Sequence, residues 1–212
     1  MKVKKTILVV LVLIFTSLLL LSCAKNITKD TNIGEYFDTY LGVTYNIYKK
    51  SNESGDTFYA KVSSVLENTR FPDISITIPQ TITYNDTVYD VTTIGDLAFY
   101  MSNFDIIYIP EGVTAIEKYA FDRAKATKID LPSTITSIGE YAFSNCVSLQ
   151  EINLTAIIPP SVGQFAFMVY DQKTNSYINS PILRINVPTT AKKRYTDINN
   201  YPQWELYQGN IR

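Results

Sequence analysis

The 212-residue sequence contains no histidine and only two cysteines. Without histidine the chain has no Ser–His–Asp triad, no histidine-ligated zinc and no histidine proton shuttle. Two cysteines are too few for a four-cysteine metal site or a disulfide framework. Charged residues make up only 18% of the chain, and the formal net charge is −1. This balance excludes the strongly basic class of proteins that bind nucleic acid by neutralising phosphates.

The apolar content indicates a folded chain. Apolar residues account for 46% of the sequence, which is enough to bury a core. The chain also has 16 tyrosines, a residue type that suits exposed strand surfaces and binding faces. The length accommodates one ordinary domain or an array of small repeats.

The N-terminus has the pattern of a targeting signal. Residues 1–5 carry three lysines, and residues 6–21 follow with thirteen apolar residues among sixteen and no charge. A membrane-spanning helix needs about 20 apolar residues, so a permanent transmembrane anchor is the weaker interpretation. Once the three lysines are removed with the signal, 16 basic residues face 20 acidic ones, which makes the mature chain mildly acidic.

The end of this apolar run resembles the lipobox of bacterial lipoproteins. Leu20-Leu21-Ser22-Cys23 has a leucine three residues before the cysteine and a small residue just before it. The resemblance implies cleavage after Ser22 and acyl chains on Cys23, which would bind membrane lipid. We therefore expect a signal peptide over residues 1–22 and a polar tether over residues 23–36. The alternative is an ordinary secretory signal with a chance cysteine.

The middle of the chain repeats. A motif of an aliphatic residue, often Gly, a polar residue, a large residue, Ala and Phe occurs four times, at spacings of 22, 22 and 24 residues. The copies begin at Ile94, Ile116, Ile138 and Val162. Alternating segments interleave with them, at residues 76–79, 107–110, 129–132, 152–155 and 185–188.

A unit of about 22 residues cannot bury its apolar face alone, so neighbouring units must stack. We predict a mainly β fold, a short leucine-rich-repeat solenoid with parallel strands, one per coil. The inward strand residues are Ile107, Ile109, Ile129, Leu131, Ile152, Leu154, Ile185 and Val187. The motif phenylalanines Phe99, Phe121, Phe143 and Phe167 fill the other side of the core. The alternative is an antiparallel sandwich whose segments are similar by coincidence.

The repeat resembles the BspA-type leucine-rich repeat of bacterial surface proteins. Residues 137–149 match its consensus almost residue for residue. Residues 155–163 resemble the Pro-Pro final repeat of family members from the Bacteroides group, and Tyr195, Trp204, Tyr207 and Ile211 resemble their C-terminal cap. The resemblance implies contact with host extracellular proteins or with other bacteria. One departure is the insert at residues 168–180, where a strand would normally follow sooner.

The flanking segments are expected to cap the solenoid. Residues 43–48 and 57–62 alternate around a polar turn, and residues 81–84 and 88–91 flank Asn85-Asp86-Thr87, so both pairs are predicted hairpins. Residues 189–195 are predicted to form a helix with Trp204 packed behind it. The predicted organisation is an N-terminal β cap over residues 37–91, repeats over 92–182, and a last strand with a helical cap over 183–212.

No catalytic chemistry is expected. Cys146 occupies a core position of the repeat, and no histidine or basic cluster lies nearby to lower its pKa. The carboxylates are scattered over different repeats, at Asp122, Asp130, Glu140 and Glu151, and nothing favours a glycosidase-like pair. No P-loop, dinucleotide glycine motif or calcium-loop spacing occurs. We therefore expect no enzyme, no cofactor and no metal.

The outward strand positions form two predicted columns. One comprises Thr77, Tyr108, Asp130, Asn153 and Asn186, and the other Ser75, Ile106, Lys128, Glu151 and Arg184. Opposite charges on neighbouring strands attract, and the alternative interpretation is a solvated face whose salt bridges contribute little. An exposed pair of Ile106 and Tyr108 suits a contact patch. The predicted binding residues are Ile106, Tyr108, Lys128, Asp130, Glu151, Asn153, Arg184 and Asn186.

These features lead to a functional hypothesis with one alternative. The chain is expected to be a lipid-anchored protein of the bacterial cell envelope, at the outer membrane or cell surface, that binds an extracellular or cell-surface protein. The alternative is an accessory or structural subunit of a cell-envelope lipoprotein complex. A second candidate binding surface is the insert, expected to be an edge loop bearing Tyr170 and Tyr177.

Overall fold

The computed structural model describes residues 29–38, 41–52, 55–65 and 75–212. The signal peptide over residues 1–22, Cys23 and the first part of the tether lie outside the described residues. The chain divides into two compact units, one of residues 1–31 and 49–57 and one of residues 32–48 and 58–212. Within the smaller unit Lys49 Nζ lies 2.5 Å from Asp56 Oδ2, and the Thr57 hydroxyl donates to the Lys50 carbonyl.

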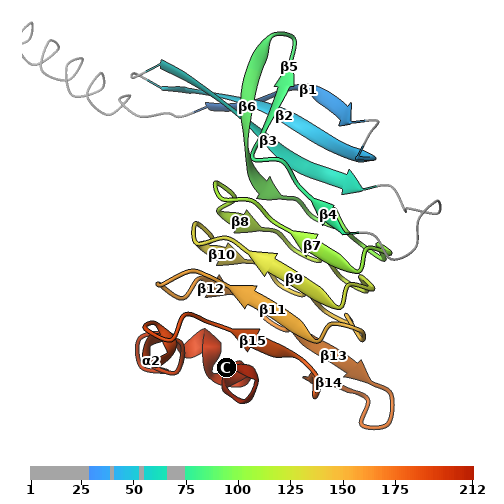
Figure 1. The fold of residues 1–212 in the computed structure, drawn as a ribbon, viewed down its shortest axis with the longest axis vertical. Coiled ribbons are helices and arrows are strands. Elements are labelled where there is room, and N and C mark those ends of the chain that lie inside the picture. Colours follow the sequence, from blue (N-terminus) through green and yellow to red (C-terminus); the bar gives the residue numbers. More distant parts are fainter. Residues whose placement is uncertain (1–28, 39–40, 53–54, 66–74) are drawn as a thin grey trace, which may run out of the picture. The chain divides into compact units, whose positions relative to one another are not determined.

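The chain is mainly β structure (Figure 1). The strands are β1 (Lys29–Asp38), β2 (Val43–Asn52), β3 (Gly55–Val65), β4 (Ile76–Thr77), β5 (Thr81–Tyr84), β6 (Thr87–Ile94), β7 (Ile106–Tyr108), β8 (Ala115–Ile116), β9 (Lys128–Leu131), β10 (Ser137–Ile138), β11 (Glu151–Leu154), β12 (Ser161–Val162), β13 (Met168–Asp171), β14 (Ser176–Asn179) and β15 (Arg184–Asn186). A short helix α2 (Lys192–Tyr195) and a 3₁₀ helix η1 (Pro202–Asn210) follow.

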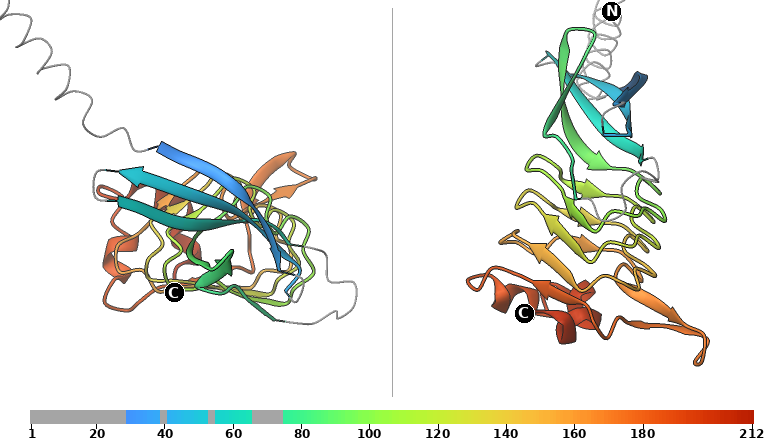
Figure 2. Two further views of the ribbon diagram at one scale, coloured as in Figure 1. Left: turned by 90° about the horizontal axis from the view of Figure 1, so that it is seen from above. Right: turned by 45° about the vertical axis from the view of Figure 1, so that its right-hand side comes forward.

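Two parallel sheets run through the repeats, which confirms the predicted solenoid (Figure 2). A five-stranded sheet has the order β15-β11-β9-β7-β4, and β6, β8, β10 and β12 are parallel neighbours in a second, eight-stranded sheet. The expectation of one strand per coil was therefore incomplete. The motif's first aliphatic residue forms its own two-residue strand, because it pairs with the same residue one coil away, as Ile116 does with Ile138.

The two predicted N-terminal hairpins are present within a larger arrangement of strands. β5 and β6 pair antiparallel, and Asn85 and Asp86 between them have φ values of 49° and 58°, as a tight type I′ turn requires. β2 and β3 are neighbours in the eight-stranded sheet, and Ser63 Oγ donates to the Thr44 carbonyl. Residues 29–36 differ from the predicted tether: they belong to β1, whose backbone joins the edge of this sheet beside β2.

A stack of phenylalanine rings forms one side of the core, as predicted. The ring centroids of Phe99 and Phe121 are 4.8 Å apart, those of Phe121 and Phe143 are 4.9 Å apart, and those of Phe143 and Phe167 are 5.3 Å apart. All four rings are buried. The predicted inward residues of the strands are buried as well: Ile107, Ile109, Ile129, Leu131, Ile152, Leu154, Ile185 and Val187.

The turns that carry these rings are held from coil to coil by backbone hydrogen bonds. The Phe121 N–H donates to the Ala142 carbonyl at 2.7 Å, and the Phe143 N–H donates to the Ala166 carbonyl at 2.7 Å. The large residue of each motif has a left-handed backbone, with φ of 57° at Tyr119 and 55° at Tyr141. That conformation costs a non-glycine residue about 1–2 kcal/mol, which the inter-coil bonds and ring burial offset.

The glycines of the motif permit this close stacking. A Cβ atom at Gly163 would lie 2.4 Å from the Glu140 backbone nitrogen, and one at Gly139 would lie 2.7 Å from the Glu117 carbonyl carbon. Neither distance leaves room for a side chain. The glycine positions therefore fix how closely one coil approaches the next.

The C-terminal segment closes the core. The predicted helix over residues 189–195 is shorter than expected, because only Lys192–Tyr195 is α-helical. The Tyr195 hydroxyl donates to the Ala156 carbonyl at 2.8 Å, and Trp204 Nε1 donates to the Pro160 carbonyl at 2.9 Å. Trp204 and Tyr207 lie on η1 and contact the Phe167 ring, so the phenylalanine stack ends under aromatic side chains rather than in solvent.

Replacing Phe121 by alanine should lower the free energy of unfolding by about 3–5 kcal/mol, because it removes a fully buried ring between two stacked neighbours. Phe143→Ala should behave alike. Chemical denaturation monitored by circular dichroism measures both. Val147→Ala is the control, since Val147 is 72% exposed and should change stability by less than about 0.5 kcal/mol. A negligible shift in either phenylalanine variant would show that the ring stack does not stabilise the solenoid.

Candidate functional site

The outward residues of the five-stranded sheet form the two predicted columns. Tyr108, Asp130, Asn153 and Asn186 are partners in consecutive strand pairs, and so are Ile106, Lys128, Glu151 and Arg184. Thr77 is the partner of Tyr108 at the β4 end, whereas Ser75 precedes β4 and is outside the sheet. The structure therefore brings all eight predicted binding residues onto one face.

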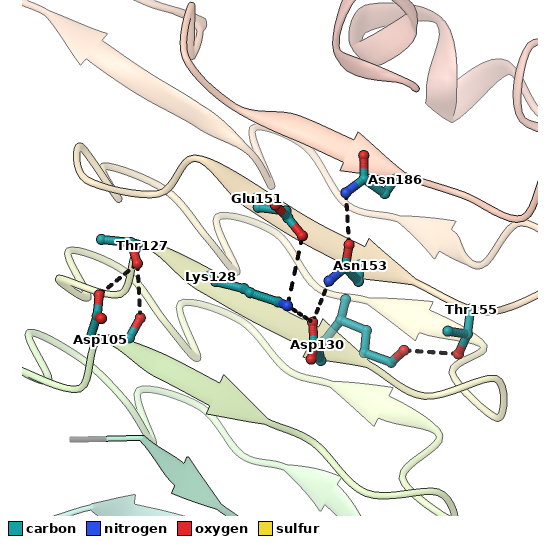
Figure 3. A network of polar contacts seen from close by, with 9 residues as sticks. Asp105, Thr127, Lys128, Asp130, Glu151, Asn153, Thr155 and Asn186 are labelled. Atoms are coloured by element: carbon teal, nitrogen blue, oxygen red, sulfur yellow. Dashed lines mark hydrogen bonds and ion pairs between the residues drawn. The ribbon is translucent and has the colours of Figure 1, made fainter. Parts of the chain in front are cut away.

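Side-chain amides and a carboxylate join the middle of this face (Figure 3). Asn186 Nδ2 donates to Asn153 Oδ1 at 2.7 Å, and Asn153 Nδ2 donates to Asp130 Oδ1 at 2.6 Å. The chain of bonds crosses three strands, one from each of three coils. Each of these polar groups already has a partner, so this part of the face is pre-ordered before any ligand binds.

Lys128 lies between two carboxylates in Figure 3. Its Nζ is 3.7 Å from Asp130 Oδ1 and 3.8 Å from Glu151 Oε1. The sequence places Glu151 between Lys128 and Arg184 in one column. In the structure, Glu151 pairs with Lys128 and not with Arg184. These ion pairs are partly exposed and each contributes little to stability.

The β7 end of the face is less polar. Ile106 and Tyr108 are the two outward residues of this strand, and Tyr108 is 36% exposed. A tyrosine there offers apolar area and a hydroxyl with few rotamers to restrict. Ile106 and Tyr108 thus give this end of the face an apolar surface.

The β15 end of the face has an arginine that the sequence-based prediction missed. The segment after η1 joins the edge of the sheet through an Ile185–Ile211 bridge. The Arg212 N–H donates to the Ile185 carbonyl at 3.0 Å, and the Val187 N–H donates to the Arg212 carbonyl at 3.3 Å. Since side chains alternate along a strand and Ile211 is buried, Arg212 extends the column that Asn186 would otherwise end. The signal in the sequence was that Arg212 directly follows Ile211, so that Arg212 points outward when Ile211 points inward.

The insert is a β-hairpin and not the expected edge loop. β13 and β14 pair antiparallel, with Tyr170 opposite Tyr177. The Tyr177 ring stacks on Phe165 with centroids 4.9 Å apart, and its edge contacts Tyr141 at 5.5 Å. This packing orders the insert against the turns of the repeats. Tyr170 remains 44% exposed, with its hydroxyl donating to Asn175 Oδ1.

Aromatic residues of the turns form a second strip that the sequence-based prediction did not assign. The Tyr119 and Tyr141 rings stack with centroids 4.9 Å apart, and Tyr141 and Phe165 are 5.2 Å apart. Tyr177 of the insert continues the strip. The signal was the fourth position of the repeat motif, which is a large residue in every copy.

Cys146 is a core residue, as predicted. Its thiol is buried and donates to the Phe121 carbonyl at 2.9 Å. Burial raises the pKa of the Cys146 thiol to about 12, which keeps it protonated and unreactive near neutral pH. Burial also raises the pKa of Asp122, while the hydrogen bond from Asn145 Nδ2 lowers it.

Within the described parts of the chain, no group of three or more Cys, Asp or Glu residues is placed to hold a metal ion. In the same residues, no helix is long and apolar enough to span a membrane. The site is thus a surface of side chains on a sheet, with an apolar end at β7 and a basic end at β15.

The comparison with models of protein families agrees with this architecture. The model of the BspA-type leucine-rich repeat region matches six copies over residues 92–199. The match is to a repeat region and indicates no family of enzymes. A search of curated proteins gave no significant match.

Among solved structures, the chain is similar to several bacterial proteins, some of them described as leucine-rich repeat proteins. One from Bacteroides capillosus is 24% identical, with 70% of this chain and 95% of that chain covered and a TM-score of 0.48. The pneumococcal vaccine antigen PcpA is 16% identical, with coverage of 76% and 52% and a TM-score of 0.42. A leucine-rich cell surface protein from Faecalibacterium prausnitzii is 18% identical, with coverage of 74% and 55% and a TM-score of 0.33.

Cys146 should react with a thiol reagent at pH 8 at least about 100-fold more slowly in the folded protein than in denaturant, because reaction requires the buried thiol to be exposed and deprotonated. The measurement uses Cys23→Ala protein, in which Cys146 is the one remaining cysteine. Reaction in native buffer at the rate of the unfolded chain would contradict a structural role in the core.

Proposed function

Because the chain belongs to the BspA-type leucine-rich repeat family, we propose that it is a membrane-anchored cell-surface lipoprotein that binds a protein partner through its five-stranded sheet. The observation that carries this proposal is the register of the outward columns. Residues from five coils lie side by side, which is the arrangement that repeat proteins use for extended binding surfaces.

Tyr108 is the proposed anchor of the contact. It is exposed, it neighbours Ile106 on the same strand, and its partner across the next strand pair is Asp130. Tyrosines at the centre of interfaces commonly account for much of the binding energy. The neighbouring amide and carboxylate groups are already hydrogen-bonded to one another, so binding does not need to order them.

The face is small, which bears on affinity. Five strands spaced about 4.8 Å apart give a sheet about 20 Å wide, and strands of two to four residues at about 3.3 Å per residue are about 7–13 Å long. The area of this face is therefore well below the roughly 800 Å² per partner of a standard protein interface. We therefore propose that one copy binds weakly and that many copies on one membrane supply avidity. Anchoring is what makes such multivalent binding possible.

The anchor is proposed from the sequence of the N-terminal segment. A basic start, an apolar run and Leu20-Leu21-Ser22-Cys23 together support lipidation of Cys23. Each buried methylene contributes about 0.8 kcal/mol, so two or three acyl chains retain a protein on a membrane.

Replacing Cys23 by alanine should abolish acylation and leave the protein unprocessed or released from the membrane, because the thiol is the proposed attachment atom. Metabolic labelling with a palmitate analogue followed by membrane fractionation measures this. Cys146→Ala is the matched control and should retain the label. Equal labelling of the wild-type and Cys23→Ala proteins would refute the lipoprotein assignment.

Tyr108→Ala should weaken binding to cells or matrix proteins by about 2 kcal/mol or more, with little change in unfolding midpoint, because the side chain points outward. Tyr170→Ala is the matched comparison, since it removes the exposed tyrosine of the insert. It is preferable to deleting residues 171–179, which would uncover Phe165.

Loss of binding in Tyr170→Ala alone would move the binding surface to the insert hairpin. Unchanged binding in both variants would exclude both surfaces as the contact and favour the accessory-subunit alternative, in which the solenoid serves as a scaffold within a cell-envelope complex.

A further inference from the structure

A cavity of about 480 Å³ opens at the β15 end of the outward face. Three stretches of the chain line it: residues 150–151 before and at the start of β11, residues 181–184 leading into β15, and Arg212. The repeats supply the first stretch, and the C-terminal cap supplies the last. The cap therefore completes the lining of the cavity by adding Arg212.

Two arginines line this cavity, and the backbone positions both. Arg184 is the first residue of β15 and the strand partner of Glu151, and its N–H donates to the Gln150 carbonyl at 2.8 Å. Arg212 is held by its backbone bonds to Ile185 and Val187. The backbone attachment sets where the two side chains leave the sheet, and Arg212 Nη1 also donates to the Ile211 carbonyl at 3.3 Å.

One of the two arginines has no anionic partner. Glu151, the one acidic side chain lining the cavity, is paired with Lys128 at 3.8 Å, and the main-chain carboxylate of Arg212 accepts from the Val187 N–H at 3.3 Å. Among the described residues, no carboxylate lies within 4.0 Å of the Arg184 guanidinium. Arginine keeps its charge at every physiological pH. Two guanidinium groups therefore line a cavity whose one side-chain carboxylate already contacts another cation, and the Arg184 guanidinium, which has no anionic partner, attracts an anion.

We propose that this cavity binds the carboxylate of an acidic side chain in the protein partner. The planar guanidinium donates two parallel N–H bonds that match the two oxygens of a carboxylate. Pro181 and Ile182 form an aliphatic wall beside the arginines, and Ile182 is 47% exposed. This wall fits an apolar side chain next to the acidic residue, so the preferred ligand is a peptide with Asp or Glu beside Leu or Ile.

This inference rests on the proposed function only for the statement that the carboxylate belongs to a protein. The probe is an acetylated and amidated pentapeptide, Gly-Gly-Asp-Leu-Gly, whose blocked ends leave one carboxylate. Its counterpart contains Asn in place of Asp. Binding to the full-length protein in neutral detergent is measured by isothermal titration calorimetry.

The Asp peptide should bind about tenfold more tightly than the Asn peptide, and Arg184→Gln and Arg212→Gln should each weaken the Asp peptide about tenfold. Glu151→Gln should strengthen binding, because it removes the competing negative charge. Arg123→Gln is the control, since Arg123 lies near Asp122 on a turn and not in the cavity, and it should change nothing.

Equal binding of the two peptides, or Asp-peptide affinity that is unchanged in both cavity arginine variants, would overturn the inference. Inorganic phosphate that displaces the peptide at equal concentration would overturn the preference for a peptide carboxylate and assign the cavity to anions in general. The proposed function fails separately: Asp-peptide binding that depends on both arginines, without any binding of the protein to cells or matrix proteins, supports the cavity and refutes the partner-binding role.

Discussion

Each coil of this protein buries its apolar side chains only by packing against the next coil. Phe121 lies between Phe99 and Phe143 at ring separations of 4.8 and 4.9 Å, and none of these rings would be buried within a single repeat. The backbone conforms to this requirement. Tyr119 adopts a left-handed conformation that costs energy in isolation, and Gly163 is tightly apposed to the neighbouring coil. The energetic cost of the left-handed backbone at Tyr119 is therefore offset by the contacts that this conformation permits between two coils.

The same stacking determines the surface. Parallel strands with one residue of each coil in register convert a sequence repeat into columns of neighbouring side chains, so that Asp130, Asn153 and Asn186 form a hydrogen-bonded series although 23 and 33 residues separate the bonded pairs. A single substitution in one repeat changes one position in a column and leaves the scaffold intact. Within this chain, the inward positions carry similar apolar residues from coil to coil while the outward positions differ, which gives one face an apolar end at β7 and a basic end at β15.

At the C-terminal end of the repeat array, the structure adds elements that are not part of the repeat. Trp204 and Tyr207 cover the last phenylalanine, and the segment that carries them continues into Arg212, which joins the edge of the sheet. A cap that protects an edge from solvent therefore also completes a charged cavity. The insert likewise has a packing residue and an exposed one: Tyr177 packs on Phe165, and Tyr170 stays exposed on the same hairpin.

The sequence by itself determined the solenoid, the buried residues of each strand and the members of both outward columns except Ser75, which lies outside the sheet. It did so because a repeat spacing sets the register between parallel strands, and a period of two assigns each side chain to a face. Only the tertiary structure decided the features that do not repeat. The pairing of Ile211 with Ile185, the hairpin in the insert and the start of β1 at Lys29 depend on which backbone edge a segment meets, and no periodicity encodes that choice. Likewise, the sequence placed Glu151 between Lys128 and Arg184, but side-chain packing decided that it pairs with Lys128 and leaves Arg184 to the cavity.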